Sequence, residues 1–230
     1  MKSSVITFPG SNCDRDMDVA LTKFGFKNKM VWHNDQELPK SDLIVLPGGF
    51  SYGDYLRCGS MASKSKIMHS VINFAKSGGL VMGICNGFQI LCESGLLPGA
   101  LLHNNSHKFI CKNVNLSTQT TNALVTNKLE KEQTILIPIA HGEGRYHADA
   151  ETLKMLNDND QVLFRYCDVD GAITDDANPN GAAENIAGVC NAGRNVFGMM
   201  PHPERAADEE LSNTDGRILF ESILAAVEVA

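Results

Sequence analysis

A cysteine between two glycines is the strongest chemical signal in the sequence. The segment G-I-C-N-G at residues 83–87 follows an apolar run and precedes a helical one, which is the thiol form of the G-x-S-x-G nucleophile elbow. Glycines are needed there because side chains two positions from so sharp a turn would collide with neighbouring chain. Cys85 would lie at a helix N-terminus, which favours a thiolate, and the Asn86 N–H would face an oxyanion. The alternative is a buried structural cysteine.

A thiolate nucleophile needs a base and a group that orients the base. The segment P-H-P-E at residues 201–204 offers both. The prolines bias His202 toward an extended conformation, in which His202 and Glu204 project to the same side. Glu204 could then hold the imidazole as the third member of a triad. Alone, this motif is equally consistent with a rigid loop.

Consecutive glycines after an apolar run suggest an oxyanion hole. Gly48, Gly49 and Phe50 follow Leu46-Pro47, and exposed backbone N–H groups at such a position can stabilise a developing oxyanion. A plain turn would account for the same residues. In the loop that follows, Tyr52, Asp54 and Arg57 either face a partner or order the glycines, and the sequence does not separate the two.

Two other motifs receive structural interpretations. His141 and Glu143 in H-G-E-G are too few for a structural zinc site, so we predict a shaped loop near the rim of the site and no metal site. Cys13 also follows a strand, but no glycine stands at position 15 to make an elbow. Asp14 is predicted to cap the next helix.

The predicted elements place these motifs at strand ends. Apolar runs alternate with helical spacing in the first half, which predicts βαβ units and a parallel sheet. The second half is richer in strands, with a hairpin turn at 191–194. We predict one α/β domain, a sandwich with an antiparallel sheet edge. Strands are expected at 5–8, 29–32, 43–46, 80–84, 109–116, 134–139, 162–166, 186–190 and 196–199, and helices at 14–24, 60–76, 86–94 and 212–227.

The net charge and the amino-acid composition argue against several classes of function. The formal net charge of −7 argues against a nucleic-acid binder and against a polybasic membrane-surface protein. No apolar run reaches the ~18 residues of a membrane span, and the start does not fit a signal peptide. Seven cysteines without a C-x-x-C pair suggest the reducing cytoplasm, with Cys58, Cys111, Cys167 and Cys190 as small buried side chains.

The order P-G-G, G-x-C-x-G-x-Q and H-P-E resembles the class I, triad-type glutamine amidotransferases. The intervening segments are similar to the glutaminase subunits of phosphoribosylformylglycinamidine synthases, over essentially the whole chain. These segments are P-G-S-N-C-D at 9–14, G-G-F-S-Y-G-D-Y-L-R-C-G at 48–59, C-N-G-F-Q-I-L at 85–91, G-L-L-P-G-A at 95–100, K-F-I-C at 108–111, H-G-E-G at 141–144 and G-M-M-P-H-P-E-R at 198–205. The resemblance implies a flavodoxin-like three-layer sandwich and a single glutamine amidotransferase type 1 domain over residues 1–230.

The resemblance also implies the chemistry and the partners. Cys85 would be the nucleophile, His202 the base and acid, and Glu204 the orienting group. Substrate contacts would come from Gly48, Gly49, Phe50, Asn86, Gln89 and the main chain near Phe109. L-glutamine would be hydrolysed and its ammonia passed to a large synthetase subunit that carries ATP and Mg²⁺, with a small bridging subunit and no cofactor on this chain. A cysteine hydrolase that acts alone and a non-catalytic scaffold subunit are the rival interpretations.

Overall fold

The strands of the first half, with one from the second, form a parallel sheet. In the computed structural model, which describes residues 1–228, a nine-stranded sheet has the order β2-β1-β3-β4-β11-β10-β9-β6-β7. Its first five strands are parallel, in the order of the flavodoxin-like fold, which confirms the predicted fold class. They are β2 (Lys27–Trp32), β1 (Lys2–Thr7), β3 (Leu43–Leu46), β4 (Leu80–Ile84) and β11 (Val196–Met199).

The antiparallel edge contains four strands, each antiparallel to its neighbour. They are β10 (Ile186–Cys190), β9 (Val162–Cys167), β6 (Ile110–Thr118) and β7 (Thr134–His141). The predicted turn after β10 does join it to β11 as a hairpin. A second sheet of β5 (Ala100–Leu102) and β8 (Arg145–His147) was not predicted, because three-residue strands are too short for a periodic signal.

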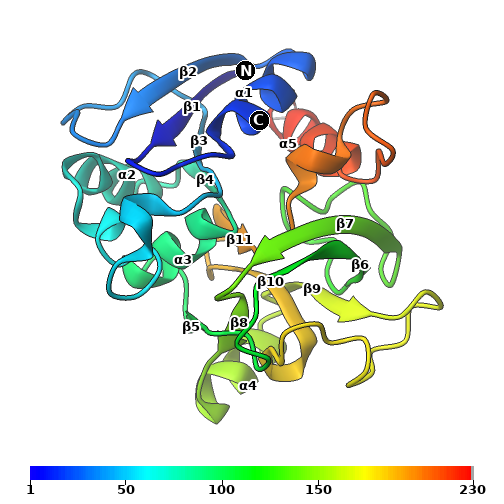
Figure 1. Cartoon of the computed structure of the whole chain (residues 1–230). Helices are drawn as coiled ribbons and strands as arrows, with labels where there is room; N and C mark the ends of the chain where they lie inside the picture. The colour runs from blue at the N-terminus through cyan, green and yellow to red at the C-terminus, as the bar shows by residue number, and fades with distance from the viewer. Residues whose placement is uncertain (229–230) are drawn as a thin grey trace.

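Helices cover the parallel strands on both faces, which gives three layers (Figure 1). On one face lie α2 (Lys66–Lys76) and α3 (Asn86–Glu93), and on the other α1 (Asp14–Lys23) and α5 (Arg217–Glu228), where Phe24 stacks on Phe220 with ring centroids 5.1 Å apart. Because both faces of the parallel strands are covered, β3, β4 and β11 are buried throughout.

Several helix boundaries differ from the prediction. The helix expected from residue 60 is a short 3-10 helix, η2 (Ala62–Lys64), followed by α2, and the one expected from Ser212 begins at Arg217. The helix α4 (Ala150–Asp158) was missed, although the Asp149 side chain accepts a hydrogen bond from Thr152 N (2.7 Å) as its N-cap. Other short 3-10 helices are η1 (Ser51–Asp54), η3 (Ala183–Asn185) and η4 (Pro203–Ala206).

Two local predictions were wrong. The first residue of α1 is Asp14, with Cys13 at the N-cap position and no side-chain capping bond. Cys111 is exposed on β6, whereas Cys58, Cys167 and Cys190 are buried as predicted. Cys111 lies in the exposed first part of β6, where Lys112 and Asn113 are exposed as well, and the sequence does not show which part of the strand is covered. All seven cysteines are free.

The carboxyl ends of the central strands bring the candidate residues to one edge. Cys13 follows β1, Gly48 follows β3, Cys85 follows β4 and His202 follows β11. Leu46 pairs with Gly83 across β3 and β4, and Met199 pairs with Ile84 across β11 and β4, so these segments leave the sheet side by side. This is where ligands bind in open α/β sheets. Within residues 1–228, no helix has the length and apolar character of a membrane span.

Candidate active site

Cys85 sits on a strained turn between β4 and α3. Its backbone has φ +50° and ψ −105°, a conformation that a residue with a side chain adopts only at a cost of about 1–3 kcal/mol. The flanking glycines are required as predicted: a Cβ on Gly87 would lie 1.9 Å from the Leu46 carbonyl oxygen, and a Cβ on Gly83 would lie 2.7 Å from the Gly87 oxygen. The segment therefore has the geometry of a nucleophile elbow.

His202 and Glu204 form a buried pair. Nδ1 of His202 lies 2.6 Å from Oε1 of Glu204, and the two side chains are 1% and 0% exposed. His202 has the predicted extended conformation (φ −105°, ψ 88°), and its N–H donates to the Pro138 carbonyl (2.8 Å). Glu204, however, lies in η4 rather than in extended chain. A turn, rather than the alternation of an extended strand, brings the carboxylate back to the ring.

Cys85 is close enough to His202 for its charge to act on the pKa of the ring. Cys85 Sγ itself donates to the Ala140 carbonyl (3.8 Å), and Nε2 of His202 has no hydrogen-bond partner among the described residues. Burial disfavours a charged His202, but the charges of Glu204 and Cys85 outweigh burial and raise its pKa well above the usual value. The ring is therefore suited to pair, as an imidazolium, with a thiolate at Cys85. The structure brings together the three residues predicted as a triad.

The glycines after β3 border the imidazole. A Cβ on Gly48 would lie 2.7 Å from Cε1 of His202, and Gly49 has φ +139°, where a Cβ would lie 2.7 Å from Asn12 N. Phe50 N–H donates to the Gly10 carbonyl (3.0 Å), so of the two N–H groups predicted after β3, that of Gly49 is the better placed for an oxyanion. Asn86 N–H, in the first turn of α3, lacks an acceptor within the helix.

Asn86 and Gln89 tie α3 to two loops. Asn86 Oδ1 accepts from Ser51 N (3.2 Å), and Asn86 Nδ2 donates to Gln89 Oε1 (2.9 Å). Gln89 Nε2 donates to the Glu143 carbonyl (2.6 Å). Both Asn86 and Gln89 are buried. Their amides therefore position the loops around Cys85 and leave few positions for direct contacts with a substrate.

Two aromatic side chains lie at the surface over the site. Phe50 and Phe109 are 43% and 54% exposed, with ring centroids 6.3 Å apart. Gly142 is beside Phe109, since a Cβ there would lie 4.0 Å from Cδ2. Beneath these loops Cys85 is 5% and His202 1% exposed. The reacting groups are covered in this conformation, so a substrate needs the loops to open.

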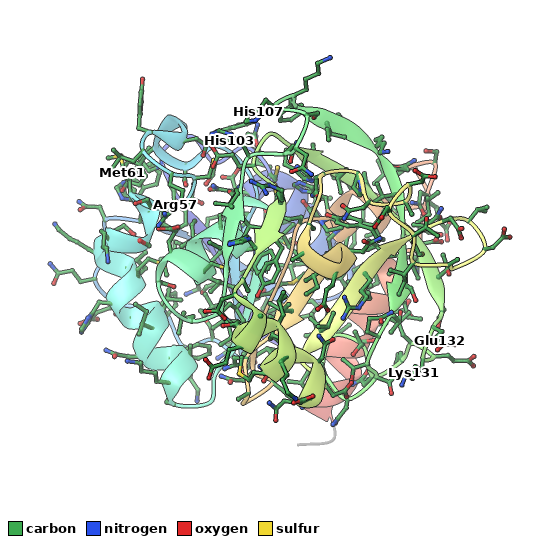
Figure 2. The ribbon with its side chains drawn as sticks, turned by 90° about the horizontal axis from the view of Figure 1, so that it is seen from below. Arg57, Met61, His103, His107, Lys131 and Glu132 are labelled. Atoms are coloured by element: carbon green, nitrogen blue, oxygen red, sulfur yellow. The ribbon has the colours of Figure 1, made fainter. Side chains whose placement is uncertain are left out.

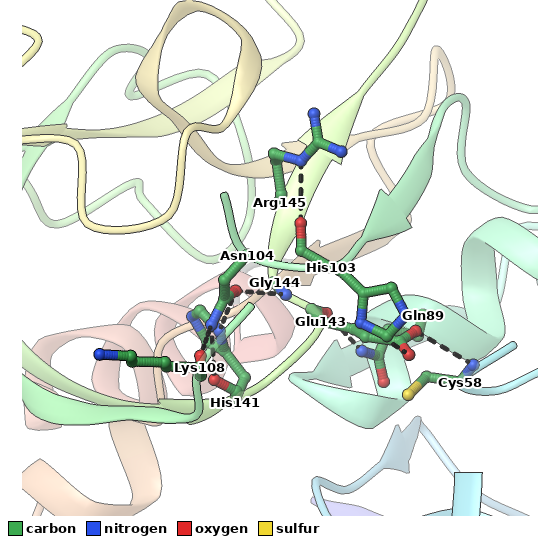
Figure 3. Close-up of polar contacts among 9 residues, drawn as sticks. All are labelled: Cys58, Gln89, His103, Asn104, Lys108, His141, Glu143, Gly144 and Arg145. Carbon is green, nitrogen blue, oxygen red and sulfur yellow. Dashed lines mark hydrogen bonds and ion pairs between the residues drawn. The ribbon is translucent and has the colours of Figure 1, made fainter. Parts of the chain in front are cut away.

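A buried cluster around His141 was missed from the sequence. Asn104 Nδ2 donates to the carbonyls of Lys108 and His141 (2.8 and 2.9 Å), which fixes the orientation of its amide (Figure 3). Asn104 Oδ1 then accepts from Gly144 N (3.1 Å) and lies 3.0 Å from His141 Nδ1. His141 Nδ1 must therefore carry the hydrogen, and its buried Nε2 has no partner. Burial first, then the charge of His202, lowers the His141 pKa to about 4, so the ring is neutral. The sequence signal that could have indicated this cluster is the polar pair His141 and Glu143, which follows the apolar run at residues 134–139.

The loop after the glycines is ordered from within the chain. Tyr52 Oη lies 2.7 Å from His33 Nδ1, and Arg57 donates two hydrogen bonds to Glu93 on α3 (2.5 and 2.8 Å). The Glu143 carboxylate accepts from Cys58 N (3.4 Å) and lies 3.3 Å from His103 Nδ1, so this loop and the 103–108 loop meet at one end of the molecule (Figure 2). These contacts favour the role of ordering the glycines.

Cys13 also reaches the triad, which the sequence did not indicate. Cys13 Sγ lies within 4.8 Å of a nitrogen of the His202 ring. It donates to Asn12 Oδ1 (3.2 Å) and accepts from Arg205 Nη2 (3.1 Å). Arg205 Nε also donates to Asp16 Oδ2 (3.0 Å). Cys13 lies beside His202 only because β1 and β11 end at the same edge of the sheet.

A flavodoxin-like sheet with a cysteine elbow facing a His–Glu pair defines the class I glutamine amidotransferases. Residues 1–218 match the family described as CobB/CobQ-like glutamine amidotransferase domain. A glutamine amidotransferase from Thermotoga maritima, 15% identical and covering 100% of this chain and 92% of its own, has the same fold with a TM-score of 0.58.

Relatives with higher sequence identity show to which family of glutamine amidotransferases the chain belongs. The phosphoribosylformylglycinamidine synthase subunit PurQ of Pelagibacter ubique (strain HTCC1062) is 62% identical over 97% of this chain and 98% of its own length. A chain of the PurLQS structure from Thermotoga maritima superposes with a TM-score of 0.88, at 47% identity and 98% coverage of both chains. The chain belongs to the PurQ family, the glutamine amidotransferase subunits of phosphoribosylformylglycinamidine synthase in purine biosynthesis.

Proposed function

We propose that this chain hydrolyses L-glutamine through a triad of Cys85, His202 and Glu204 and delivers the ammonia to a synthetase subunit. The observation that carries the proposal is the buried His202–Glu204 pair (2.6 Å), whose ring is close enough to the elbow cysteine for the charge of Cys85 to raise its pKa. The match to the PurQ family supports glutamine as the substrate.

In the proposed mechanism the Cys85 thiolate attacks the side-chain amide carbon of glutamine. The N–H groups of Gly49 and Asn86 stabilise the tetrahedral oxyanion, each by about 3 kcal/mol. The His202 imidazolium protonates the departing ammonia, and the neutral ring then takes a proton from the water that hydrolyses the glutamyl thioester. Glu204 keeps Nδ1 protonated and stabilises the imidazolium. The α-amino and carboxylate groups of glutamine would bind among Gly48, Gln89 and the loops that carry Phe50 and Phe109.

Activity is expected to depend on a partner. Cys85 and His202 are almost fully buried, and docking of a synthetase would open the covering loops and prevent loss of ammonia. We propose a large synthetase subunit and a small bridging subunit as partners, by analogy with the PurLQS structure of the Thermotoga maritima relative. ATP and Mg²⁺ would bind the synthetase, which would make formylglycinamidine ribonucleotide.

We also propose the extent of the domain, the compartment in which the chain works and the absence of a cofactor. A single glutamine amidotransferase domain spans residues 1–230, of which 229–230 lie outside the described residues. The family match to residues 1–218 supports this extent. The chain works in the cytoplasm, where it would bind the other subunits of the complex. It carries no cofactor of its own.

The test compares a variant at Cys85 with a variant at Cys92, each in the complex reconstituted with a synthetase subunit. Cys85→Ser should lower glutamine-dependent synthesis by about 10³-fold or more, with synthesis from added ammonium intact. Cys92→Ser, further along α3, should leave both unchanged. The proposal is wrong if the Cys85→Ser complex still uses glutamine at the wild-type rate. Loss of both syntheses would instead indicate that the variant does not assemble, which size-exclusion chromatography checks.

A further inference from the structure

A buried imidazole beside the active site has no role in the proposed mechanism. His141 is 3% exposed and is the last residue of β7, a strand whose main chain borders both reacting groups. The Pro138 carbonyl accepts from His202 N (2.8 Å). The Ala140 carbonyl accepts from Cys85 Sγ (3.8 Å). We propose that Nε2 of His141 accepts a hydrogen bond from the nitrogen that leaves glutamine, and then from the water that replaces it.

The contacts of His141 determine which of its nitrogens is free. Asn104 Oδ1 lies 3.0 Å from His141 Nδ1, and the orientation of the Asn104 amide makes this oxygen an acceptor, so Nδ1 carries the ring hydrogen (Figure 3). In the neutral ring Nε2 is therefore an acceptor only. Nε2 is buried and has no hydrogen-bond partner among the described residues. An unpaired buried acceptor costs about 1–3 kcal/mol, which a hydrogen bond from the substrate would offset.

The ring of His141 is held in place without using Nε2. A Cβ on Gly144 would lie 2.2 Å from Cε1 and 2.5 Å from Nε2 of the ring, so only glycine lets the main chain pack against it there. Gly144 N donates to Asn104 Oδ1 (3.1 Å), and the Gly144 carbonyl accepts from Asn180 Nδ2 (2.9 Å). These contacts fix the orientation of the ring and leave the Nε2 lone pair available.

The two imidazoles of the site differ in protonation. Burial, and then the charge of the nearby His202, lowers the pKa of His141 to about 4. The pKa of His202 is instead raised well above its usual value. At pH 7 His202 is therefore a proton donor, whereas His141 is neutral and only accepts. Both rings have a buried Nε2 that lacks a partner among residues 1–228, so a reacting group that exchanges a proton with one also has an acceptor in the other.

The departing nitrogen is the first such group. In the tetrahedral intermediate this nitrogen takes a proton from His202 and leaves as ammonia, while the C–N bond breaks and the carbonyl re-forms. One of its other N–H groups donates to His141 Nε2. Neutral His141 has no proton on Nε2 to give, so the nitrogen leaves as NH₃, the nucleophilic form that a synthetase needs.

The attacking water is the second group. Water takes the place of ammonia and gives one proton to His202 as its oxygen bonds to the thioester carbon, and the Cys85 thiolate leaves with the electrons of the C–S bond. The remaining O–H donates to His141 Nε2. Two partners thus fix the direction of attack, which is worth more than a single contact because the lone pair must face the carbon.

The inference rests on the proposed function, and its test compares two variants of His141 in the reconstituted complex. In His141→Asn the amide nitrogen takes the position of Nδ1, so the donor to Asn104 is kept and the acceptor is lost. In His141→Gln the amide oxygen takes the position of Nε2 and keeps the acceptor. We expect kcat for glutamate release to fall about 10- to 100-fold in His141→Asn, at unchanged KM, and only about threefold in His141→Gln. Exposed His69→Asn is the control and should match wild type.

Hydroxylamine separates a chemical role from a structural one. It competes with water for the glutamyl thioester and, as the stronger nucleophile, depends less on an acceptor that orients it. His141→Asn should therefore raise the ratio of glutamyl hydroxamate to glutamate by about 10-fold. A site that is merely loosened would form both products more slowly and leave their ratio unchanged.

Three results would overturn the role of His141. They are a raised KM at unchanged kcat in His141→Asn, equal losses of kcat in both variants, and a product ratio in His141→Asn that equals that of wild type. The first would show that His141 holds glutamine rather than a reacting group. Failure of the proposed function looks different: the wild-type complex would release no glutamate, or Cys85→Ser would still release it.

Discussion

His202 and Glu204, two residues apart, place Nδ1 and Oε1 at 2.6 Å in a site that excludes water from both side chains. Such a contact holds the ring in one orientation and one tautomer. It also accounts for much of the raised pKa of His202, since burial alone would lower it. The Glu204 carboxylate therefore both orients the imidazole of His202 and stabilises its protonated form.

Glu204→Gln is expected to lower kcat for glutamine hydrolysis by about 10²- to 10⁴-fold, because an amide can orient Nδ1 wrongly and does not stabilise the imidazolium. The measurement is glutamate release in the reconstituted complex. Ammonium-dependent synthesis serves as the control and should remain. Hydrolysis within a factor of about three of wild type, less than 1 kcal/mol, would rule out this role.

Because His141 is buried and neutral, we expect the free energy of unfolding to fall at acid pH. Its pKa is lowered to about 4 by burial, so between pH 6.5 and 4 the unfolded chain binds a proton that the folded chain does not. This group therefore lowers the free energy of unfolding as the pH falls, by about 2–3 kcal/mol between pH 7 and 4.5.

Urea unfolding at pH 7 and 4.5, in the wild type and in His141→Asn, checks this prediction. Even if His141→Asn is less stable overall, its loss of stability between the two pH values should be smaller. Exposed His69 provides the control, and His69→Asn should keep the wild-type difference. An unchanged pH difference in His141→Asn would show that His141 does not titrate as described.

Gly87→Ala is expected to destabilise the fold by about 3 kcal/mol or more. A Cβ there meets the Leu46 carbonyl oxygen at 1.9 Å, and neither backbone segment can yield without disturbing the sheet. Gly25→Ala is the matched control, because Gly25 has φ +81° but open space around it, and it should cost only about 1 kcal/mol. Equal losses in chemical denaturation would contradict the steric explanation.

Gln89→Leu should loosen the loop that contains Glu143. It removes the hydrogen bond to the Glu143 carbonyl (2.6 Å) and leaves Asn86 Nδ2 without its acceptor. Unpaired buried groups cost about 1–3 kcal/mol. We expect a KM for glutamine raised by roughly 10-fold and a smaller change in kcat, measured by glutamate release. A variant with unchanged KM and stability would show that this tie is dispensable.

Short-range sterics made the elbow and the H-P-E motif predictable. Glycines two positions on either side of Cys85 are required by the turn itself, and the prolines beside His202 restrict its backbone locally. The parallel strands were predictable for a similar reason, because strands covered on both faces are continuous apolar runs. The same motifs, in this order, also resemble one family.

Contacts between distant segments depended on the tertiary structure. The sequence determined that Cys85 and His202 each end a strand. Only the sheet order decided that Cys13, at the end of β1, would meet His202 as well. The Asn104–His141 bond likewise depends on how the loop after β5 packs against the end of β7. Backbone propensity acts over a few residues, whereas the packing of the sheet sets which strand ends are neighbours.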